Sequence, residues 1–215
     1  MLDLFGYAVL KKSEGRDEKF YFKFGNQVEE HDLNKYFRSY DELTSIEKKI
    51  IDLSYGSILD VGCGTGIYEP YLIKKGDVLG IDISDYMIKV SKNNGITCTK
   101  KMNIFEIDIN NKYDTILFIE NNLGMVGNIN KLRDLIVLLD IILKPTGQII
   151  TNIPKGIKGI IVTKLMPIYE GKEGQEFEWL HLSPSVISIE FGKCNFESEI
   201  LEENESEFLV RITKS

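Results

Sequence analysis

The sequence predicts an α/β protein built on a mostly parallel sheet with helices on both faces. Short apolar segments alternate with amphipathic ones from residue 57 to residue 153, which is the pattern of strands separated by helices. A glycine-rich turn, "DVGCGTG", follows the first of these strands, and Asp82 ends the second. After Pro154 the pattern changes to paired strands, so an antiparallel strand pair is expected to complete the sheet.

The composition fits one globular domain over residues 1–215, with 43% hydrophobic and 27% charged residues. A net charge of -7 disfavours a nucleic-acid partner, since a surface that binds nucleic acid must neutralise phosphates. Cys63, Cys98 and Cys194 are odd in number and far apart, which predicts neither a disulfide framework nor a metal site and favours a reducing compartment. The start of the chain is a poor signal peptide, and the apolar runs are too short to span a bilayer. A soluble, cytoplasmic protein is expected.

Residues 1–56 are expected to form a cover over the sheet. Residues 19–30 alternate aromatic with polar side chains, as in a half-buried hairpin. Asp32 can cap a short helix, and a second helical pattern follows. The two helices are predicted at 33–40 and 41–55.

The central part, residues 57–153, alternates between the two kinds of element. Strands are predicted at 57–62, 78–84, 96–101, 113–120 and 148–153. Helices are predicted at 68–76, 85–95 and 129–147, the last one closed by Pro145.

Beyond Pro154 the chain is expected to add two parts to the sheet. Residues 154–182 predict a hairpin insertion, with strands at 159–169 and 176–182. Residues 183–215 predict a helix with Ser183 as its cap and Pro184 at its first position, followed by a strand pair at 198–203 and 207–214.

The glycine-rich turn occupies the place where parallel sheets bind ligands, outside the carboxyl end of the first strand. A dinucleotide-binding turn has the spacing G-x-G-x-x-G, whereas Gly62, Gly64 and Gly66 are spaced G-x-G-x-G. A Walker phosphate loop needs Gly-Lys-Ser or Gly-Lys-Thr, but Ile67 follows the last glycine. Neither phosphate-binding pattern fits well, and a nicotinamide-dependent oxidoreductase remains the alternative.

The turn and its acidic partner resemble motifs of the class I S-adenosylmethionine-dependent methyltransferases. Asp60 and the three glycines match the family pattern E/D-x-G-x-G-x-G, and Asp82 stands where the family places the acid that binds the ribose hydroxyls. Residues 29–43, 120–128 and 176–184 resemble a little-characterised branch of small bacterial and archaeal members. The resemblance covers nearly the whole chain. It implies a Rossmann-like class I methyltransferase sheet, with S-adenosylmethionine as cofactor and S-adenosylhomocysteine as product.

The resemblance also implies further residues at the cofactor. Asn103 occupies the slot in which the family often has an acid that reads the adenine amino group, with Asp108 as the alternative. For Ile83 and Met87 a packing role is the alternative, because apolar residues at such places are core in most folds. The residues implied beside the motif are Cys63, Ile83, Met87, Asn103, Ile104, Glu120 and Asn121.

Methyl transfer depends mainly on alignment of the acceptor and exclusion of water, so a dedicated catalytic residue is not obligatory. Glu120, His181 and Tyr36 are the candidates, although Tyr36 lies in an aromatic stripe typical of packing and a lone histidine is more often structural. Trp179 is expected to anchor the insertion. The segment "ENNLGM" lacks the N-P-P-Y signature of nucleic-acid amino-methylating enzymes, which favours a small-molecule acceptor. A cofactor-binding protein without transferase activity is the remaining alternative.

Overall fold

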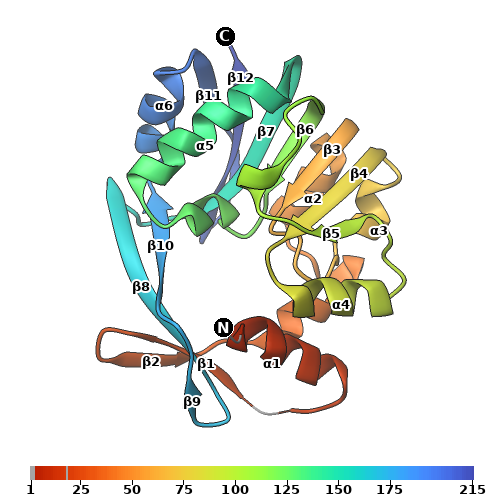
Figure 1. The fold of residues 1–215 in the computed structure, drawn as a ribbon. Helices are drawn as coiled ribbons and strands as arrows, with labels where there is room; N and C mark the ends of the chain where they lie inside the picture. The colour runs from red at the N-terminus through yellow and green to blue at the C-terminus, as the bar shows by residue number, and fades with distance from the viewer. Residues whose placement is uncertain (1–2, 18) are drawn as a thin grey trace.

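A computed structural model describes residues 3–17 and 19–215; residues 1, 2 and 18 of the predicted cover lie outside the described residues. Its main feature is a seven-stranded sheet with the order β11-β12-β7-β6-β3-β4-β5 (Figure 1). The central strands run parallel, and β12 pairs antiparallel with both β7 and β11. The α/β fold predicted from the sequence is confirmed. The strands are β3 (Gly56–Val61), β4 (Gly76–Asp82), β5 (Thr99–Lys101), β6 (Tyr113–Phe118), β7 (Leu143–Pro154), β11 (Phe196–Glu203) and β12 (Glu207–Lys214).

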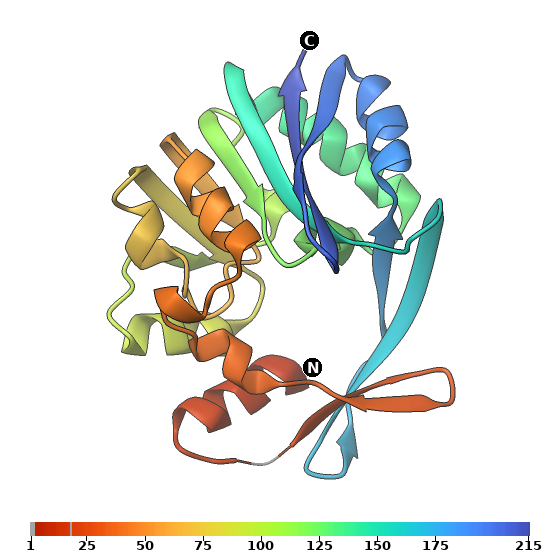
Figure 2. The same ribbon diagram turned by 180° about the vertical axis from the view of Figure 1, so that it is seen from behind.

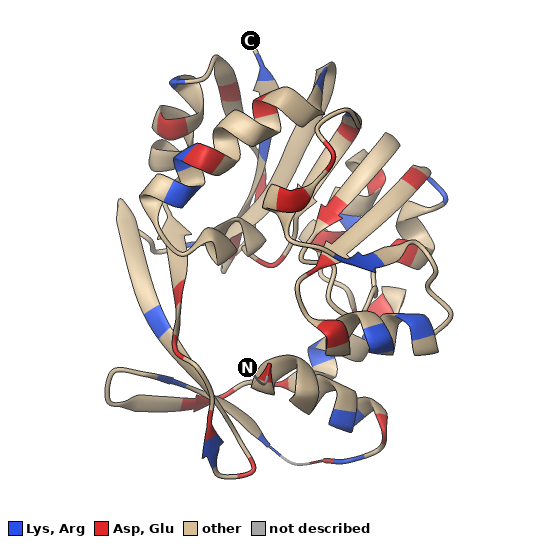
Figure 3. Ribbon diagram, viewed as in Figure 1, with Lys and Arg blue, Asp and Glu red and all other residues tan. Residues whose placement is uncertain are grey.

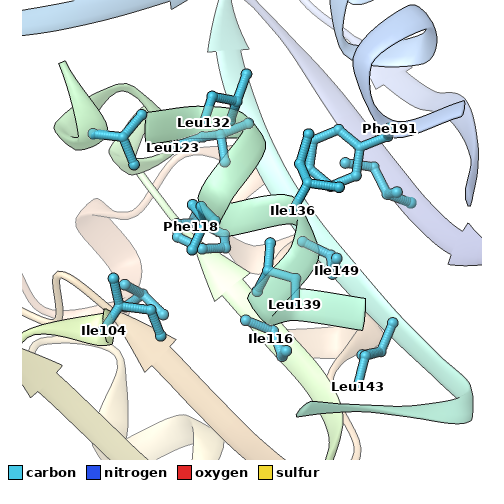
Figure 4. Close-up of a cluster of buried hydrophobic side chains, with 14 of the residues drawn as sticks. Ile104, Ile116, Phe118, Leu123, Leu132, Ile136, Leu139, Leu143, Ile149 and Phe191 are labelled. Atoms are coloured by element: carbon cyan, nitrogen blue, oxygen red, sulfur yellow. The ribbon is translucent and has the colours of Figure 1, made fainter. Parts of the chain in front are cut away.

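Helices cover both faces of this sheet because its strands are apolar on both sides. Leu59, Ile116 and Ile149 point to the face covered by α5 (Ile129–Ile142) and α6 (Pro184–Gly192), and Figure 4 shows part of this core. The neighbouring residues Ile58, Leu117 and Ile150 point to the other face. That face is covered by α2 (Ser45–Leu53), seen in front in Figure 2, and α3 (Glu69–Leu72).

A second sheet lies beyond the carboxyl edge of the first (Figure 1). Two hairpins far apart in sequence form it, because β1 pairs antiparallel with β8 from Phe20–Tyr169 to Lys23–Met166. Both hairpins are predicted from the sequence, but their union in one sheet is not. The strands are β1 (Phe20–Phe24), β2 (Gln27–Glu30), β8 (Ile160–Tyr169), β9 (Lys172–Glu173) and β10 (Phe177–Leu182).

Helix α1 (Leu4–Ser13), which is not among the predicted elements, joins the two sheets. Asp3 caps it by accepting a hydrogen bond from the N–H of Gly6 over 2.9 Å. Its apolar side packs with Phe20 of the second sheet and with Met87 of α4 (Asp85–Asn93). The N-terminal segment is therefore part of the same packed body as the central part, residues 57–153.

The predicted helices of the cover are shorter than expected. The first is a 3-10 helix, η1 (Leu33–Phe37), and Asp32 caps it as predicted by accepting from the N–H of Asn34. A second 3-10 turn, η2 (Tyr40–Glu42), precedes α2. Helix α2 begins only after Thr44, because Thr44 and Glu47 form a capping box there.

Two boundaries in the central part also differ from the prediction. Helix α3 has a single turn, since the chain has to enter β4 at Gly76. Helix α5 ends at Ile142 instead of continuing to residue 147. Pro145 therefore lies inside β7 and not in the last turn of the helix. A proline disfavours helical backbone at the residue before it, so the helix stops early and the strand takes over. Among the described helices, none combines the length and apolar character that crossing a bilayer requires.

Candidate functional site

The glycine-rich turn joins β3 to α3 at the carboxyl edge of the large sheet. Gly62, Gly64 and Gly66 have φ angles of 81°, 56° and 80°, in the left-handed region that favours glycine. The N–H groups of Gly62 and Cys63 donate to the carbonyl of Ile81 in β4 over 2.8 and 3.1 Å. The backbone conformation itself therefore requires these glycines, and the turn is fixed against the second strand.

Asp82, at the end of β4, is bonded directly to the turn. Its Oδ2 accepts from the N–H of Gly64 at 3.0 Å, and its Oδ1 accepts from the N–H of Ser84 at 2.8 Å. Burial raises the pKa of Asp82 to about 6, and the charge of Asp3 adds to this rise, while the backbone hydrogen bonds oppose it. Ser84 caps α4 through the N–H of Met87, so Asp82 is not needed as the cap.

Tyr36, from the N-terminal cover, lies over the turn. Its carbonyl accepts a hydrogen bond from the Thr65 hydroxyl, and a Cβ placed on Gly64 would lie 3.9 Å from its ring. Its hydroxyl is 3.0 Å from Nε2 of His31, and its ring packs edge-on against Phe5. The structure thus brings the cover and the glycine turn into contact.

Ionisation of Tyr36 is strongly disfavoured at this place. Burial raises the pKa of its hydroxyl, and the charges of Glu120 and Asp82 raise it further. A hydroxyl that stays protonated can donate hydrogen bonds but does not serve as a ready base. Tyr36 is therefore better suited to positioning than to proton abstraction.

The backbone after β6 is held in a strained form. Glu120 and Asn121 both have a φ angle of 58°, which is uncommon for residues other than glycine and is found where surrounding contacts enforce it. Asn152 supplies these contacts, because its side chain accepts from the N–H of Glu120 at 2.8 Å and its carbonyl accepts from the N–H of Asn121 at 3.1 Å. Asn122 then donates to the carbonyl of Gly62 over 2.9 Å. The segment is thereby fixed against the glycine turn.

A charged network ties the cover to this segment. The guanidinium of Arg38 donates to both oxygens of Glu47, over 2.6 and 3.0 Å, and to Oε1 of Glu120 over 3.3 Å. Burial alone would raise the pKa of Glu47, but the hydrogen bonds from Arg38 and Tyr68 hold it below its usual value. Burial raises the pKa of Glu120, whose side chain is half exposed.

Strand β10 of the second sheet contributes His181 and Trp179 to the site. His181 Nδ1 lies 3.4 Å from the side-chain amide of Asn121, and burial lowers the pKa of His181, which keeps its imidazole neutral. The Trp179 ring packs on Gly124, where a Cβ would lie 2.6 Å from Nε1 of the indole. Trp179 therefore contacts η4 (Asn122–Val126) after β6, and His181 contacts Asn121 directly before it.

The remaining predicted cofactor residues differ in exposure. Ile83 follows Asp82 and is 70% exposed, whereas Met87 and Ile104 are only 3% and 5% exposed and pack in the core. Asn103 is exposed after β5 and caps η3 (Ile104–Glu106). Asp108 lies near the start of β6. Burial raises the pKa of Tyr113, and the charge of Asp108 raises it further. Cofactor contacts by these residues stay predictions, and Asn103 is better placed than Asp108.

Three residues that the sequence does not single out complete the site, together with Asn122, which the sequence places with Glu120 and Asn121 at the end of the fourth predicted strand. Arg38, Glu47 and Asn122 hold its parts together, and Glu69 lies buried below the turn. Of the three, a signal existed only for Glu47, which stands at the third position of a capping box before an apolar run. Among the described residues, no group of His, Cys, Asp and Glu is arranged to hold a metal ion.

Comparison with known proteins agrees with this geometry. Residues 58–147, from β3 to the start of β7, match the family model described as a methyltransferase domain. The resemblance to the class I S-adenosylmethionine-dependent methyltransferases predicted from the sequence is confirmed over this stretch. The cofactor of this family is S-adenosylmethionine.

Solved structures of this family share the fold. A methyltransferase from Bacteroides fragilis, in complex with S-adenosyl-L-homocysteine, has a TM-score of 0.90 at 22% identity, covering 99% of this chain and 95% of that one. A methyltransferase from Clostridium acetobutylicum has a TM-score of 0.60 at 16% identity, covering 85% and 96%. A sugar N-methyltransferase from a Streptoalloteichus species has a TM-score of 0.59 at 12% identity, covering 90% and 97%. At these identities the likeness concerns the fold.

One curated relative is similar in sequence over a shorter stretch. It is a protein of Methanocaldococcus jannaschii described as a putative protein N5-glutamine methyltransferase. Identity is 32% over 77 residues, which is 33% of this chain. The chain spans only 39% of the length of that relative.

The residues around the glycine-rich turn fit S-adenosylmethionine as the cofactor. Gly62 faces the loop after β6, and Gly64 faces Tyr36. Neither glycine has a side chain that would fill the space between the turn and these neighbours. Ile83 offers an exposed apolar surface directly after Asp82. The buried carboxyl groups of Asp60 and Asp82 suit a ligand that carries positive charge.

Proposed function

We propose that the chain transfers a methyl group from S-adenosylmethionine to a small molecule with an amine nitrogen. The observation that carries the transferase proposal is the bond between the Asp82 carboxylate and the N–H of Gly64, within a turn of three left-handed glycines. This geometry places the acid of the second strand beside the glycines of the first, as binding of an adenosine requires. The G-x-G-x-G spacing does not favour a nicotinamide cofactor.

The chain's own residues would divide the binding of the cofactor among them. Asp82 would accept hydrogen bonds from the ribose hydroxyls, and Ile83 would contact the adenine face. Asn103 would accept from the adenine amino group through its side-chain oxygen. Tyr36 would cover the methionine end and exclude water. When bound, S-adenosylmethionine supplies an electrophilic methyl group on a positively charged sulfur.

The acceptor side is formed by Glu120, Asn121 and His181. The half-exposed carboxylate of Glu120 would attract an ammonium group, and the neutral imidazole of His181 can take up the proton that this ammonium has to lose before its nitrogen attacks. The similar Streptoalloteichus protein is a sugar N-methyltransferase, which supports a nitrogen acceptor. Acidic and basic residues are mixed along α4 and α5 (Figure 3), and the net charge of -7 argues against a nucleic-acid acceptor.

A product assay tests the proposal. The purified protein is incubated with S-adenosylmethionine and panels of amino sugars, other small amines, hydroxyl compounds and a glutamine-containing peptide, and S-adenosylhomocysteine is measured by mass spectrometry. Turnover with a small amine, strongly reduced in Asp82→Ala at low concentrations of S-adenosylmethionine, is the expected result. Turnover only with the peptide or only with hydroxyl compounds would overturn the amine proposal. Tight cofactor binding without turnover on any panel would instead favour a binding protein.

A further inference from the structure

Beneath the glycine turn lies a pair of buried carboxyl groups from β3 and α3. Asp60 is 1% exposed and Glu69 is 0% exposed. Asp60 Oδ2 and both carboxyl oxygens of Glu69 lack a hydrogen-bond partner of normal geometry among the described residues. A Cβ placed on Gly80 would lie 2.5 Å from Glu69 Oε1 and 3.1 Å from Cys63 Sγ, so the pair is wedged between β4 and the turn. Leaving such groups buried and unpaired is costly unless something compensates them.

The surroundings of the pair contain further acids and thiols. Asp82 faces it from β4, and Cys63 and Cys98 face it from the turn and from the residue before β5. Burial raises the pKa of both thiols, which keeps them neutral. Of the ion pairs in the described part of the chain, none includes the carboxyl groups of Asp60, Glu69 or Asp82. Among residues 3–17 and 19–215, no Lys, Arg or His therefore forms an ion pair with these three carboxyl groups.

We propose that Asp60 and Glu69 share a proton in the free protein, that binding of the cationic cofactor on the turn expels it, and that the pair thereby selects the sulfonium cofactor over its neutral thioether product. The inference rests on the proposed function, since it assumes that S-adenosylmethionine binds at this turn. Asp60 and Glu69 act here as specificity-determining residues, whereas the ribose role of Asp82 is separate. No bond to carbon forms or breaks in this step; one proton passes from Glu69 to solvent.

The direction of the effect follows from the electrostatics of the pair. Burial raises the pKa of Glu69, and the charge of Asp60 raises it further, so Glu69 holds the proton in the free protein. Burial raises the pKa of Asp60 to about 7, although the neighbouring carboxyl group of Glu69 lowers it. A positive charge brought near the pair favours the ionised forms and releases the proton. Affinity for the cation should therefore rise with pH, by up to about tenfold per pH unit for one proton.

Calorimetry of the intact protein tests this. S-adenosylmethionine and S-adenosylhomocysteine are titrated at neutral pH in phosphate and in Tris, whose different ionisation enthalpies reveal proton release. We expect proton release with the sulfonium compound and much less with the thioether. We also expect the affinity ratio of the two to rise several-fold between about pH 6 and about pH 8.

Two variants assign the effect to the pair. Glu69→Gln keeps the shape but cannot ionise, and it should abolish most of the proton release and flatten the pH dependence. Glu190→Gln removes another buried glutamate far from the turn and should leave both unchanged. If Glu69→Gln does not fold, Asp60→Asn is measured in its place.

The outcomes separate this inference from the proposed function. Binding of S-adenosylmethionine by the wild type with equal proton release for both compounds, or with none, would overturn the carboxyl-pair proposal and leave the transferase function standing. Unchanged release in a folded Glu69→Gln variant would do the same. Failure of the wild type to bind S-adenosylmethionine at all would overturn both.

Discussion

The Asp82 carboxylate fixes the glycine turn and can also bind a ligand. It holds the Gly64 and Ser84 N–H groups through its two oxygens, and each oxygen has a further lone pair left for a ligand. Because the acid is tied to the turn before any ligand arrives, it loses little freedom on binding. This is the property expected of a preorganised binding group.

Replacement of Asp82 tests its assigned role. Asp82→Ala should weaken binding of S-adenosylmethionine by about 1.5 to 3 kcal/mol, because a hydrogen bond to a charged group is lost, and Asp82→Asn should have a milder effect. Asp85→Ala is the control, since this exposed neighbour forms an ion pair with Lys101 on the surface. Calorimetry measures the affinities. Equal affinity in wild type and a folded Asp82→Ala variant would contradict the ribose assignment.

The sequence predicts the residues of the site whose role is set by position along the chain. The glycines and Asp82 lie at strand ends, so their meeting follows from the parallel order of β3 and β4. The contacts of Arg38 with Glu47 and of Asn122 with Gly62 depend on how loops pack, and no local pattern encodes them. Glu69 was missed because an acid in the first turn of a helix is ordinarily a surface residue.

At the scale of elements, the cover is attached to the sheet through Arg38. Its guanidinium lies between the buried Glu47 of α2 and Glu120 after β6, so one side chain links three segments. The union of β1 with β8 attaches the second hairpin. The sequence predicted each of these elements but not their pairing, since pairing between strands so far apart in sequence is decided by tertiary packing.

Breaking the link at Arg38 should destabilise the fold. Arg38→Met should lower the free energy of unfolding by about 3 kcal/mol, because Glu47 would remain buried without its cation. The double variant Arg38→Met, Glu47→Leu should recover much of this loss. Lys101→Met, which removes a surface ion pair, should change it by less than about 1 kcal/mol. Urea unfolding gives these values, and equal effects of Arg38→Met and Lys101→Met would show that the buried network does not stabilise the cover.

At the scale of the whole molecule, the buried acids make stability depend on pH. The pKa values of Asp60 and Asp82 are raised by burial to about 7 and about 6, above those of the unfolded chain. Carboxyl groups of this kind contribute stability at low pH that is lost as the pH rises through their folded-state values. The Tm of the free protein should therefore fall between about pH 5 and about pH 8, and S-adenosylmethionine should reduce this fall. Thermal unfolding with and without cofactor checks it; a Tm that rises over this range would contradict it.

The two sheets should also respond together to the cofactor. Tyr36 lies over the turn, and Trp179 packs on the loop that is bonded to Gly62 through Asn122. Cofactor should therefore lower amide hydrogen exchange around Tyr36 and Trp179 as well as in the turn. Protection restricted to residues 58–90 would show that the cover and the insertion are packing surfaces and take no part in closing the site.

Direct titration tests whether this turn binds S-adenosylmethionine. The protein is titrated by calorimetry with S-adenosylmethionine, S-adenosylhomocysteine and NAD under the same conditions. The G-x-G-x-G turn bonded to Asp82 predicts binding of the first two and no heat from NAD. Tight binding of NAD without a signal from S-adenosylmethionine would contradict the assignment of this turn to S-adenosylmethionine.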